Sequence, residues 1–255
     1  MSGWQQAEFT RAAGTRMHAA VLGPADAPDV VCVHGLGCSH RYFLPLARRL
    51  APRARVAAPD LPGFGRTPGP PEPLDVRGLS VALADWLRAT RRANALLVAN
   101  SGGCQIVADL AVHAPELLGP VVLNGPTVDR HARSPLHQIG RQLANSRLER
   151  ATLGVVIARD YLDCGPRRWL ATFRYLIEDP IERKLPHLRT PAIVARGSRD
   201  PIVPRAWAQE VTRLLPDGRL AEVPGAGHTL NYSAPHELAR IVGSLLPEHS
   251  AGVPR

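Results

Sequence analysis

A serine on a tight turn is the first residue in this sequence that could do chemistry. Residues 96–107 read LLVANSGGCQIV, and Ser101 lies between two apolar segments, directly before two glycines. A nucleophile on such a turn adopts a strained backbone that exposes its hydroxyl, and small residues two positions before and after it prevent a collision between strand and helix. Ala99 and Gly103 fill those positions, with alanine where glycine is usual. The stretch predicts a serine nucleophile; a glycine-rich turn with an incidental serine is the alternative.

A second turn offers the groups that acyl transfer needs around a developing negative charge. Residues 31–37 read VCVHGLG, again an apolar run followed by a tight turn. Two backbone N–H groups must point at the oxyanion, and we expect them from Gly102 and Leu36. We interpret His34 as a residue that orients this loop, and we also keep His34 and Gly35 as candidates for contact with the substrate.

Two further stretches offer a carboxylate and an imidazole. Asp200 lies in RGSRDPIVP (196–204) and can orient a histidine base, although a turn or helix cap is the alternative role. Asp129, which follows the preceding predicted strand, is the rival acid. His228 lies in VPGAGHTL (223–230), where a flexible loop could set a general base against the serine. A loop histidine with satisfied hydrogen bonds is the alternative for His228.

The elements that must position these residues alternate between strand and helix patterns. Most of the strand candidates are near-continuous apolar runs, as buried parallel strands are: 30–33, 55–58, 96–99, 120–123, 191–195 and 219–223. Helical patterns cover about 40–50, 75–92, 103–113, 204–215 and 234–246. This alternation favours an α/β fold with a mostly parallel, doubly wound sheet, in which ligands bind beyond the carboxyl ends of the strands.

The alternation stops after Asn124. Residues 126–189 are rich in arginine and leucine and have the pattern of several helices. We therefore expect a core formed by residues 1–125 and 190–255, with a helical cap inserted at 126–189. Among the apolar cap residues, the candidate substrate contacts are Tyr161, Trp169 and Phe173, with Leu136, Leu143, Leu153, Val156 and Tyr175 in a wider set.

The charge of the chain raises the question of an anionic partner. The formal net charge is +9, but the arginines are scattered, Lys184 is the only lysine, and no nucleic-acid-binding motif occurs. We expect a solvated basic surface and no nucleic acid. Five arginines of the cap could recognise a carboxylate, but solvated helix faces explain them better: Arg141, Arg147, Arg150, Arg159 and Arg168.

The cysteines and the hydropathy pattern limit the compartment. Cys32, Cys38, Cys104 and Cys164 form no C-x-x-C pair, so we expect free thiols in a reducing compartment and no metal site. We read Cys104 as a packing residue rather than a second nucleophile. No apolar run is long enough for a membrane span, and the N-terminal residues lack a secretion-signal pattern. We expect a cytoplasmic monomer or homodimer that acts on a small molecule.

The order Ser…Asp…His, with each residue just beyond a predicted strand, resembles the α/β-hydrolase superfamily. The best-matched pieces are VHGLG (33–37), DLPGFGRT (60–67), ANSGG (99–103), GSRDPIVP (197–204) and GAGHTLNYSAPHELA (225–239). The resemblance implies that Ser101 is the nucleophile, His228 the base and Asp200 its orienter. It also implies an oxyanion hole at Leu36 and Gly102, a helical cap and no cofactor.

The resemblance implies a serine hydrolase that cleaves a small carboxylester or lactone through an acyl-enzyme. The Asn-Ser-x-Gly-Gly turn is similar to that of hydrolases that split carbon–carbon bonds in vinylogous diketones, but Thr229 stands where those enzymes usually have tryptophan. A serine nucleophile argues against dehalogenase and epoxide hydrolase activity. Non-enzymatic alternatives are a slow-turnover small-molecule receptor of the same fold and, more weakly, a binder of anionic polymers.

Overall fold

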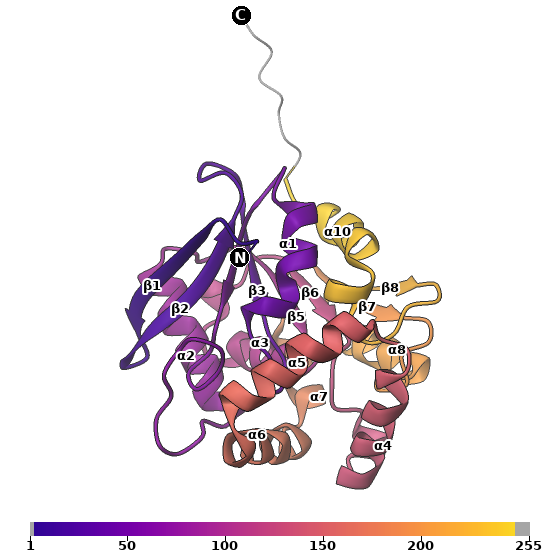
Figure 1. The fold of residues 1–255 in the computed structure, drawn as a ribbon. Helices are drawn as coiled ribbons and strands as arrows, with labels where there is room; N and C mark the ends of the chain where they lie inside the picture. The colour runs from indigo at the N-terminus through magenta and orange to yellow at the C-terminus, as the bar shows by residue number, and fades with distance from the viewer. Residues whose placement is uncertain (1–2, 248–255) are drawn as a thin grey trace, which may run out of the picture.

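The computed structural model describes residues 3–247, which fold around an eight-stranded sheet covered by helices (Figure 1). The strands are β1 (Gln6–Ala12), β2 (Thr15–Leu22), β3 (Asp29–Val33), β4 (Arg55–Pro59), β5 (Leu96–Asn100), β6 (Val121–Asn124), β7 (Ala192–Gly197) and β8 (Gly218–Val223). Their order in the sheet is β1-β2-β4-β3-β5-β6-β7-β8. β2 runs antiparallel to both of its neighbours, while β3 to β8 are parallel. The prediction of a mostly parallel α/β fold is confirmed.

The first two strands form a hairpin that the sequence pattern did not reveal. The pairing runs from Gln6↔Val21 to Ala12↔Thr15, and Ala13 and Gly14 form the turn with φ of 51° and 69°. Positive φ at both central residues is what a two-residue hairpin turn requires. Alanine rarely adopts that conformation, and much of β1 is exposed, so neither turn nor strand leaves a clear hydrophobic signal.

Helices pack on both faces of the sheet. α1 (Leu44–Leu50) and α10 (Pro235–Gly243) cover one face, and α2 (Val76–Ala89), α3 (Gly102–His113) and α8 (Arg205–Leu214) cover the other (Figure 1). Successive strand residues point to opposite faces. β3 accordingly contributes Val31 and Val33 to the core beneath α2, α3 and α8, and Val30 and Cys32 to the core beneath α1 and α10. The predicted helices agree with these elements to within a few residues.

The chain between β6 and β7 contributes further helices, which lie together on one side of the sheet (Figure 1). They are η3 (Arg130–Ala132), α4 (Pro135–Ser146), α5 (Ala151–Cys164), α6 (Pro166–Glu178), α7 (Ile181–Lys184) and η4 (Leu185–His187). The remaining short helices are η1 (His40–Phe43), η2 (Pro115–Leu117) and α9 (Leu230–Ser233). We keep the name cap for residues 126–189, whose separation from the core remains a prediction. Residues 1–2 and 248–255 of the predicted core lie outside the described residues.

Two further predictions concern free cysteines and the lack of a membrane-spanning segment. All four cysteines are free thiols in the structure, and all four are buried, where they pack as small apolar residues. Across residues 3–247, no helix is both long enough and apolar enough to pass through a bilayer.

Candidate active site

Ser101 lies on the turn between β5 and α3 with φ 56° and ψ −124°. A positive φ is uncommon for a residue with a side chain. Such strained backbone conformations cluster at functional sites. A Cβ atom on Gly103 would lie 2.4 Å from the carbonyl oxygen of Val33, so the close approach of α3 to β3 requires glycine there. The turn holds Ser101 at the carboxyl end of β5, which is where parallel sheets bind ligands.

His228 and Asp200 meet at the same edge of the sheet. Nδ1 of His228 lies 2.8 Å from Oδ2 of Asp200. Oδ1 of Asp200 accepts the backbone N–H groups of Ile202 at 2.8 Å and Val203 at 3.1 Å. Asp200 therefore caps its own turn and orients the histidine, so the two roles considered for it coexist. Because Nδ1 carries the proton that it donates, Nε2 is the nitrogen that can accept one.

The free nitrogen of His228 and the hydroxyl of Ser101 face one cavity. Both residues line it, and Nε2 of His228 is buried without a hydrogen-bond partner among the described residues. A buried polar atom without a partner is costly and marks a place where a ligand group is expected. Hydrogen bonds between catalytic groups are often loose without substrate and tighten when it binds.

Two glycines that the sequence analysis missed make room for His228. Gly125, just after β6, has φ 64°, and a Cβ there would lie 2.7 Å from Cε1 of the histidine ring. A Cβ on Gly197, at the end of β7, would lie 2.1 Å from the carbonyl oxygen of Gly227. The signal in the sequence was a glycine two residues beyond each of two predicted strands, 120–123 and 191–195.

The charge around His228 favours the protonated imidazole. Burial alone would lower the pKa of His228, but the charge and hydrogen bond of Asp200, with a smaller contribution from Glu149, raise this pKa above its ordinary value. The ring is therefore a stronger base than an isolated histidine. As the pH falls, it also becomes protonated sooner, at a higher pH than an isolated histidine would.

The loop of residues 34–37 lies against the Ser101 turn. A Cβ on Gly35 would be 3.0 Å from Cβ of Ser101 and 3.0 Å from the carbonyl oxygen of Asn100. Within residues 3–247 no acceptor takes the N–H of Leu36, and the N–H of Gly102 is one of the unpaired donors at the start of α3. Both N–H groups are thus without a partner among the described residues, and their role as an oxyanion hole remains a prediction.

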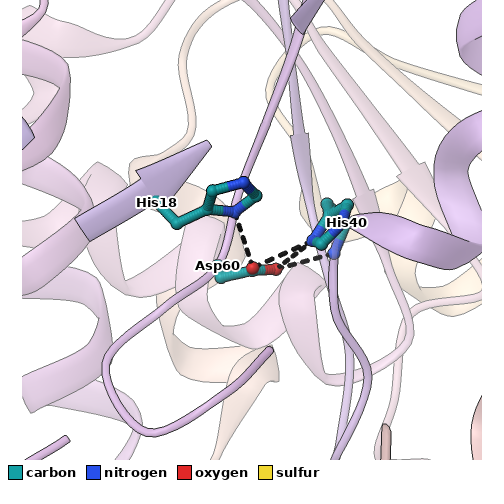
Figure 2. Close-up of side chains that lie close together, drawn as sticks. All are labelled: His18, His40 and Asp60. Atoms are coloured by element: carbon teal, nitrogen blue, oxygen red, sulfur yellow. Dashed lines mark hydrogen bonds and ion pairs between the residues drawn. The ribbon is translucent and has the colours of Figure 1, made fainter. Parts of the chain in front are cut away.

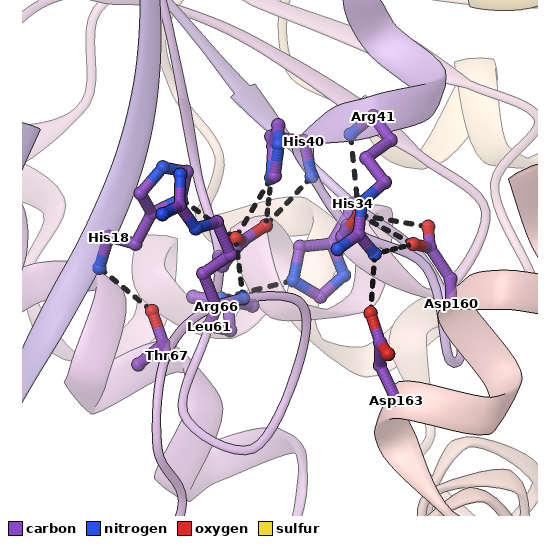
Figure 3. Close-up of polar contacts among 11 residues, drawn as sticks. His18, His34, His40, Arg41, Leu61, Arg66, Thr67, Asp160 and Asp163 are labelled. Atoms are coloured by element: carbon purple, nitrogen blue, oxygen red, sulfur yellow. Dashed lines mark hydrogen bonds and ion pairs between the residues drawn. The ribbon is translucent and has the colours of Figure 1, made fainter. Parts of the chain in front are cut away.

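His34 joins this loop to residue 61 through two hydrogen bonds of its ring. Its Nδ1 donates to the carbonyl of Gly35 at 2.9 Å. Its Nε2 accepts the N–H of Leu61 at 3.1 Å (Figure 3). Burial lowers the pKa of His34, which agrees with a neutral ring. His34 is not among the residues that line the cavity, so the geometry fits the loop-orienting role and does not bring it to the substrate.

A buried carboxylate next to His34 joins two more histidines (Figure 2). Nδ1 of His18 and Nδ1 of His40 each lie 2.9 Å from Oδ2 of Asp60, and the backbone N–H of Arg66 donates to the same oxygen. Burial would raise the pKa of Asp60, but the hydrogen bonds from the two histidines hold it well below the usual range. These side chains are of types that bind metals. Since N–H donors already occupy the carboxylate, we interpret the group as a hydrogen-bond network that fixes residues 60–67.

The cavity lies between the core and the cap, and its empty space of about 970 Å³ includes solvent at its open mouth. Of the cap residues expected to contact substrate, those that line it are Leu143, Tyr161, Trp169 and Phe173. The other four do not line it: Leu136, Leu153, Val156 and Tyr175. Leu136 is 81% exposed, and Leu153 and Val156 pack into the core. Helical periodicity identifies an apolar side chain but not which of several apolar surroundings it enters.

The walls of the cavity are mostly apolar, although polar side chains such as Gln138, Gln142 and His228 are among the lining residues. The rings of Trp169 and Phe173 stack with centroids 5.2 Å apart. No Asp, Glu, Lys or Arg side chain is among the lining residues that the structure describes. The five cap arginines singled out in the sequence are therefore not placed to bind a carboxylate inside the cavity.

The two rivals for catalytic roles are engaged elsewhere. Asp129 accepts Nη1 of Arg141 at 2.9 Å and the N–H of His131 at 3.0 Å, so its carboxylate serves its own loop. Cys104 is fully buried in α3 with its thiol directed to the carbonyl of Ala99. Burial raises the pKa of the Cys104 thiol well above its usual range, which disfavours the thiolate.

Comparison with known proteins places this geometry in context. The sequence profile of the alpha/beta hydrolase family matches residues 30–241. A pimeloyl-[acyl-carrier protein] methyl ester esterase of Chromobacterium violaceum is 28% identical, with 86% of this chain and 94% of that protein aligned. A putative carbamate hydrolase, RutD, of Yersinia enterocolitica is 26% identical over 86% of this chain and 87% of that protein.

Solved structures share the fold at lower identity. The enol-lactonase from Burkholderia xenovorans superposes with a TM-score of 0.76 at 19% identity, covering 93% of this chain and 99% of that one. A thermophilic esterase from Thermogutta terrifontis has a TM-score of 0.75 at 20% identity, covering 94% and 97%. At such identities the likeness establishes the architecture alone.

Proposed function

The chain belongs to the alpha/beta hydrolase family, and from that premise we propose that it is a serine hydrolase that cleaves a small, largely apolar carboxylester or lactone through an acyl-enzyme. One observation carries the proposal. The imidazole of His228 is bound to Asp200 through Nδ1, its Nε2 has no hydrogen-bond partner among the described residues, and His228 and Ser101 line the same cavity.

In the proposed cycle, Oγ of Ser101 attacks the acyl carbon while Nε2 of His228 takes its proton. The N–H groups of Leu36 and Gly102 hold the negative oxygen of the tetrahedral intermediate, and losing one such donor typically costs about 100- to 1000-fold in rate. His228 then protonates the departing alkoxide oxygen. A water molecule, deprotonated by His228, attacks the acyl-enzyme, and collapse of the second intermediate returns the proton to Ser101 and releases the acid.

The relatives support acyl chemistry of this kind. An esterase and a putative carbamate hydrolase both act at a carbonyl carbon that bears a heteroatom, and each aligns with most of this chain. The apolar walls at Trp169, Phe173 and Leu143 favour an uncharged acyl or aryl group. The identity of the substrate is left to a screen.

The pH dependence follows from the charge around His228. The pKa of this histidine is raised above 6.5, and the neutral imidazole is the form that takes the serine proton. We therefore expect kcat/KM to fall as the pH drops through an apparent pKa above 6.5. Initial rates with a neutral ester, measured from pH 5 to 9, give this value. An acid limb below that of ordinary histidine would contradict the electrostatic account.

The uncharged cavity predicts discrimination against anionic acyl groups. Two aryl esters of equal chain length can be compared, one ending in a methyl group and one in a carboxylate. Burying a carboxylate without a partner costs several kcal/mol, so we expect kcat/KM for the anionic ester to be at least about 100-fold lower. Equal rates for the two esters would contradict this account, because they would show that a positively charged side chain pairs with the carboxylate of the bound substrate.

Labelling with a fluorophosphonate, followed by a substrate panel, tests the function itself. We expect the label on Ser101 and many turnovers per chain on apolar esters or lactones. Faster turnover of a vinylogous diketone than of any ester would favour the carbon–carbon hydrolase. Labelling with barely more than one turnover per chain would favour a small-molecule receptor.

A further inference from the structure

The loop that carries His228 is held by the cap as well as by the core. Oδ1 of Asn145 accepts the backbone N–H of His228 at 3.0 Å, and Oε1 of Glu149 accepts the N–H of Thr229 at 2.8 Å. Asn145 lies in the last turn of α4, and Glu149 lies in the connection from α4 to α5. Both belong to the predicted cap and precede the histidine loop by 83 and 80 residues.

The two cap residues form one fully bonded unit. Nδ2 of Asn145 donates to Oε1 of Glu149 at 3.2 Å, and the hydroxyl of Ser233 donates to Oε2 of Glu149. The carboxylate can only accept and the backbone N–H of His228 can only donate, so the amide of Asn145 has one possible orientation. Asn145 is 2% exposed. A Cβ on Gly227 would lie 3.1 Å from Oδ1 of Asn145 and 3.1 Å from Oε1 of Glu149, so the loop is packed directly against the pair.

We propose that Asn145 and Glu149 are positioning residues that clamp the loop of His228 to the cap, so that the imidazole faces Ser101 only while the cap occupies this position. The inference rests on the proposed function. Asp200 holds the ring from the core through Nδ1, and the clamp holds the backbone of the same residue from the cap. Neither clamp residue lines the cavity, so both act through the base.

Glu149 also acts through its charge. Among the described residues, two carboxylates face His228: Asp200 from the β7–α8 connection and Glu149 from the α4–α5 connection. Both raise the pKa of the imidazole against the effect of burial. The other groups in contact with the ring or its backbone, Gly125 and Asn145, carry no charge. Removing the charge at position 149 should therefore lower the pKa of His228 and keep the neutral base at lower pH.

Two variants and one control separate these contributions. Glu149→Gln removes the charge and keeps an oxygen that accepts the N–H of Thr229 and the Nδ2 group of Asn145, while its NH₂ group faces the hydroxyl of Ser233, which can accept. Asn145→Ala removes the acceptor for the N–H of His228. Glu178→Gln makes the same charge change on an exposed position of the cap, where the carboxylate pairs with Arg174.

We expect Glu149→Gln to move the acid limb of kcat/KM to lower pH, while kcat on the alkaline plateau stays within about threefold of the wild type. Asn145→Ala should lower kcat about 10- to 100-fold with little change in KM, because a small misplacement of a catalytic group is enough to cost that much. Glu178→Gln should change neither. A ¹⁵N NMR titration of the His228 ring reports its pKa without any turnover. If Asn145→Ala does not fold, Glu149→Ala takes its place, because it removes the acceptor for the N–H of Thr229; it should lower kcat in the same way, and wild-type kcat in this variant would overturn the clamp.

The outcomes distinguish the clamp from the function. If fluorophosphonate labels wild-type Ser101, but Glu149→Gln leaves the His228 titration and the acid limb unmoved and folded Asn145→Ala keeps wild-type kcat, the clamp is overturned and the hydrolase stands. If wild-type Ser101 is not labelled and no ester turns over, the hydrolase proposal fails, and the NMR titration still decides whether Glu149 acts on His228.

Discussion

Replacing Ser101 by alanine should lower kcat/KM for an apolar aryl ester by about a million-fold and leave the protein folded. The hydroxyl is the only group lost. Alanine has the same Cβ atom as serine and accepts the same φ of 56° at about the same cost, so the turn between β5 and α3 should persist. Initial rates give the loss, and the fluorophosphonate adduct, located by mass spectrometry, should disappear from this peptide.

Cys104→Ser is the matched control for this experiment. Cys104 lies one helical turn beyond Ser101 and is fully buried, so it should neither react with the label nor contribute to turnover. We expect the control to be labelled at Ser101 and to retain most of its activity. Thermal unfolding checks that both variants are folded. Hydrolysis by Ser101→Ala within tenfold of the wild type would mean that another group is the nucleophile.

The sequence revealed most of what lies close to a strand end. The turn at Ser101, the loop at Leu36 and the loops of Asp200 and His228 each follow an apolar run within a few residues. In a parallel sheet the carboxyl ends of such runs share one edge, so local patterns are enough to predict that these residues meet. Gly103 is an example of such a local requirement. A Cβ at this position would collide with the carbonyl oxygen of Val33 in the neighbouring strand β3, so the residue must be glycine.

Contacts across long stretches of chain were not predictable in this way. The clamp joins Asn145 and Glu149 to a loop some 80 residues away, and neither residue stands in a motif. The sequence could not show which apolar cap residues line the cavity for the same reason. Leu136 and Leu143 belong to one helical pattern, but only Leu143 lines the cavity. Which side of a cap helix faces the core depends on how α4 to α6 pack together. That packing is set by many weak contacts and not by a short pattern.

The core and the cap thus contribute different parts of one site. In the proposed mechanism the core positions the serine, the acid and the oxyanion donors at or just beyond strand ends, and such elements change little when loops vary. His228 lies on a loop between the two parts and donates one hydrogen bond to each, from Nδ1 to Asp200 and from its backbone N–H to Asn145. If the proposed mechanism holds, the step in which His228 receives the proton of Ser101 therefore depends on the cap.

Asp200→Asn should lower kcat by about 10,000-fold, the second-largest effect we expect, because it inverts the hydrogen bond to His228. The backbone N–H groups of Ile202 and Val203 both require an acceptor at this side chain. They will hold the amide oxygen of asparagine and turn its NH₂ group toward Nδ1. An NH₂ donor needs an unprotonated Nδ1, so the proton moves to Nε2, and the histidine can no longer take the proton of Ser101. Single-turnover rates with an activated ester measure the loss.

Asp129→Asn is the control that makes this test decisive. Asp129 is the rival acid, but its carboxylate bonds Arg141 and the N–H of His131, and neither of these bonds involves His228. We expect its substitution to change kcat by no more than about threefold. The NMR titration of His228 should show a lower pKa in Asp200→Asn, since the nearest carboxylate is lost, and no change in Asp129→Asn. The reverse pattern, with activity lost at position 129 and kept at position 200, would transfer the role of orienting acid to Asp129.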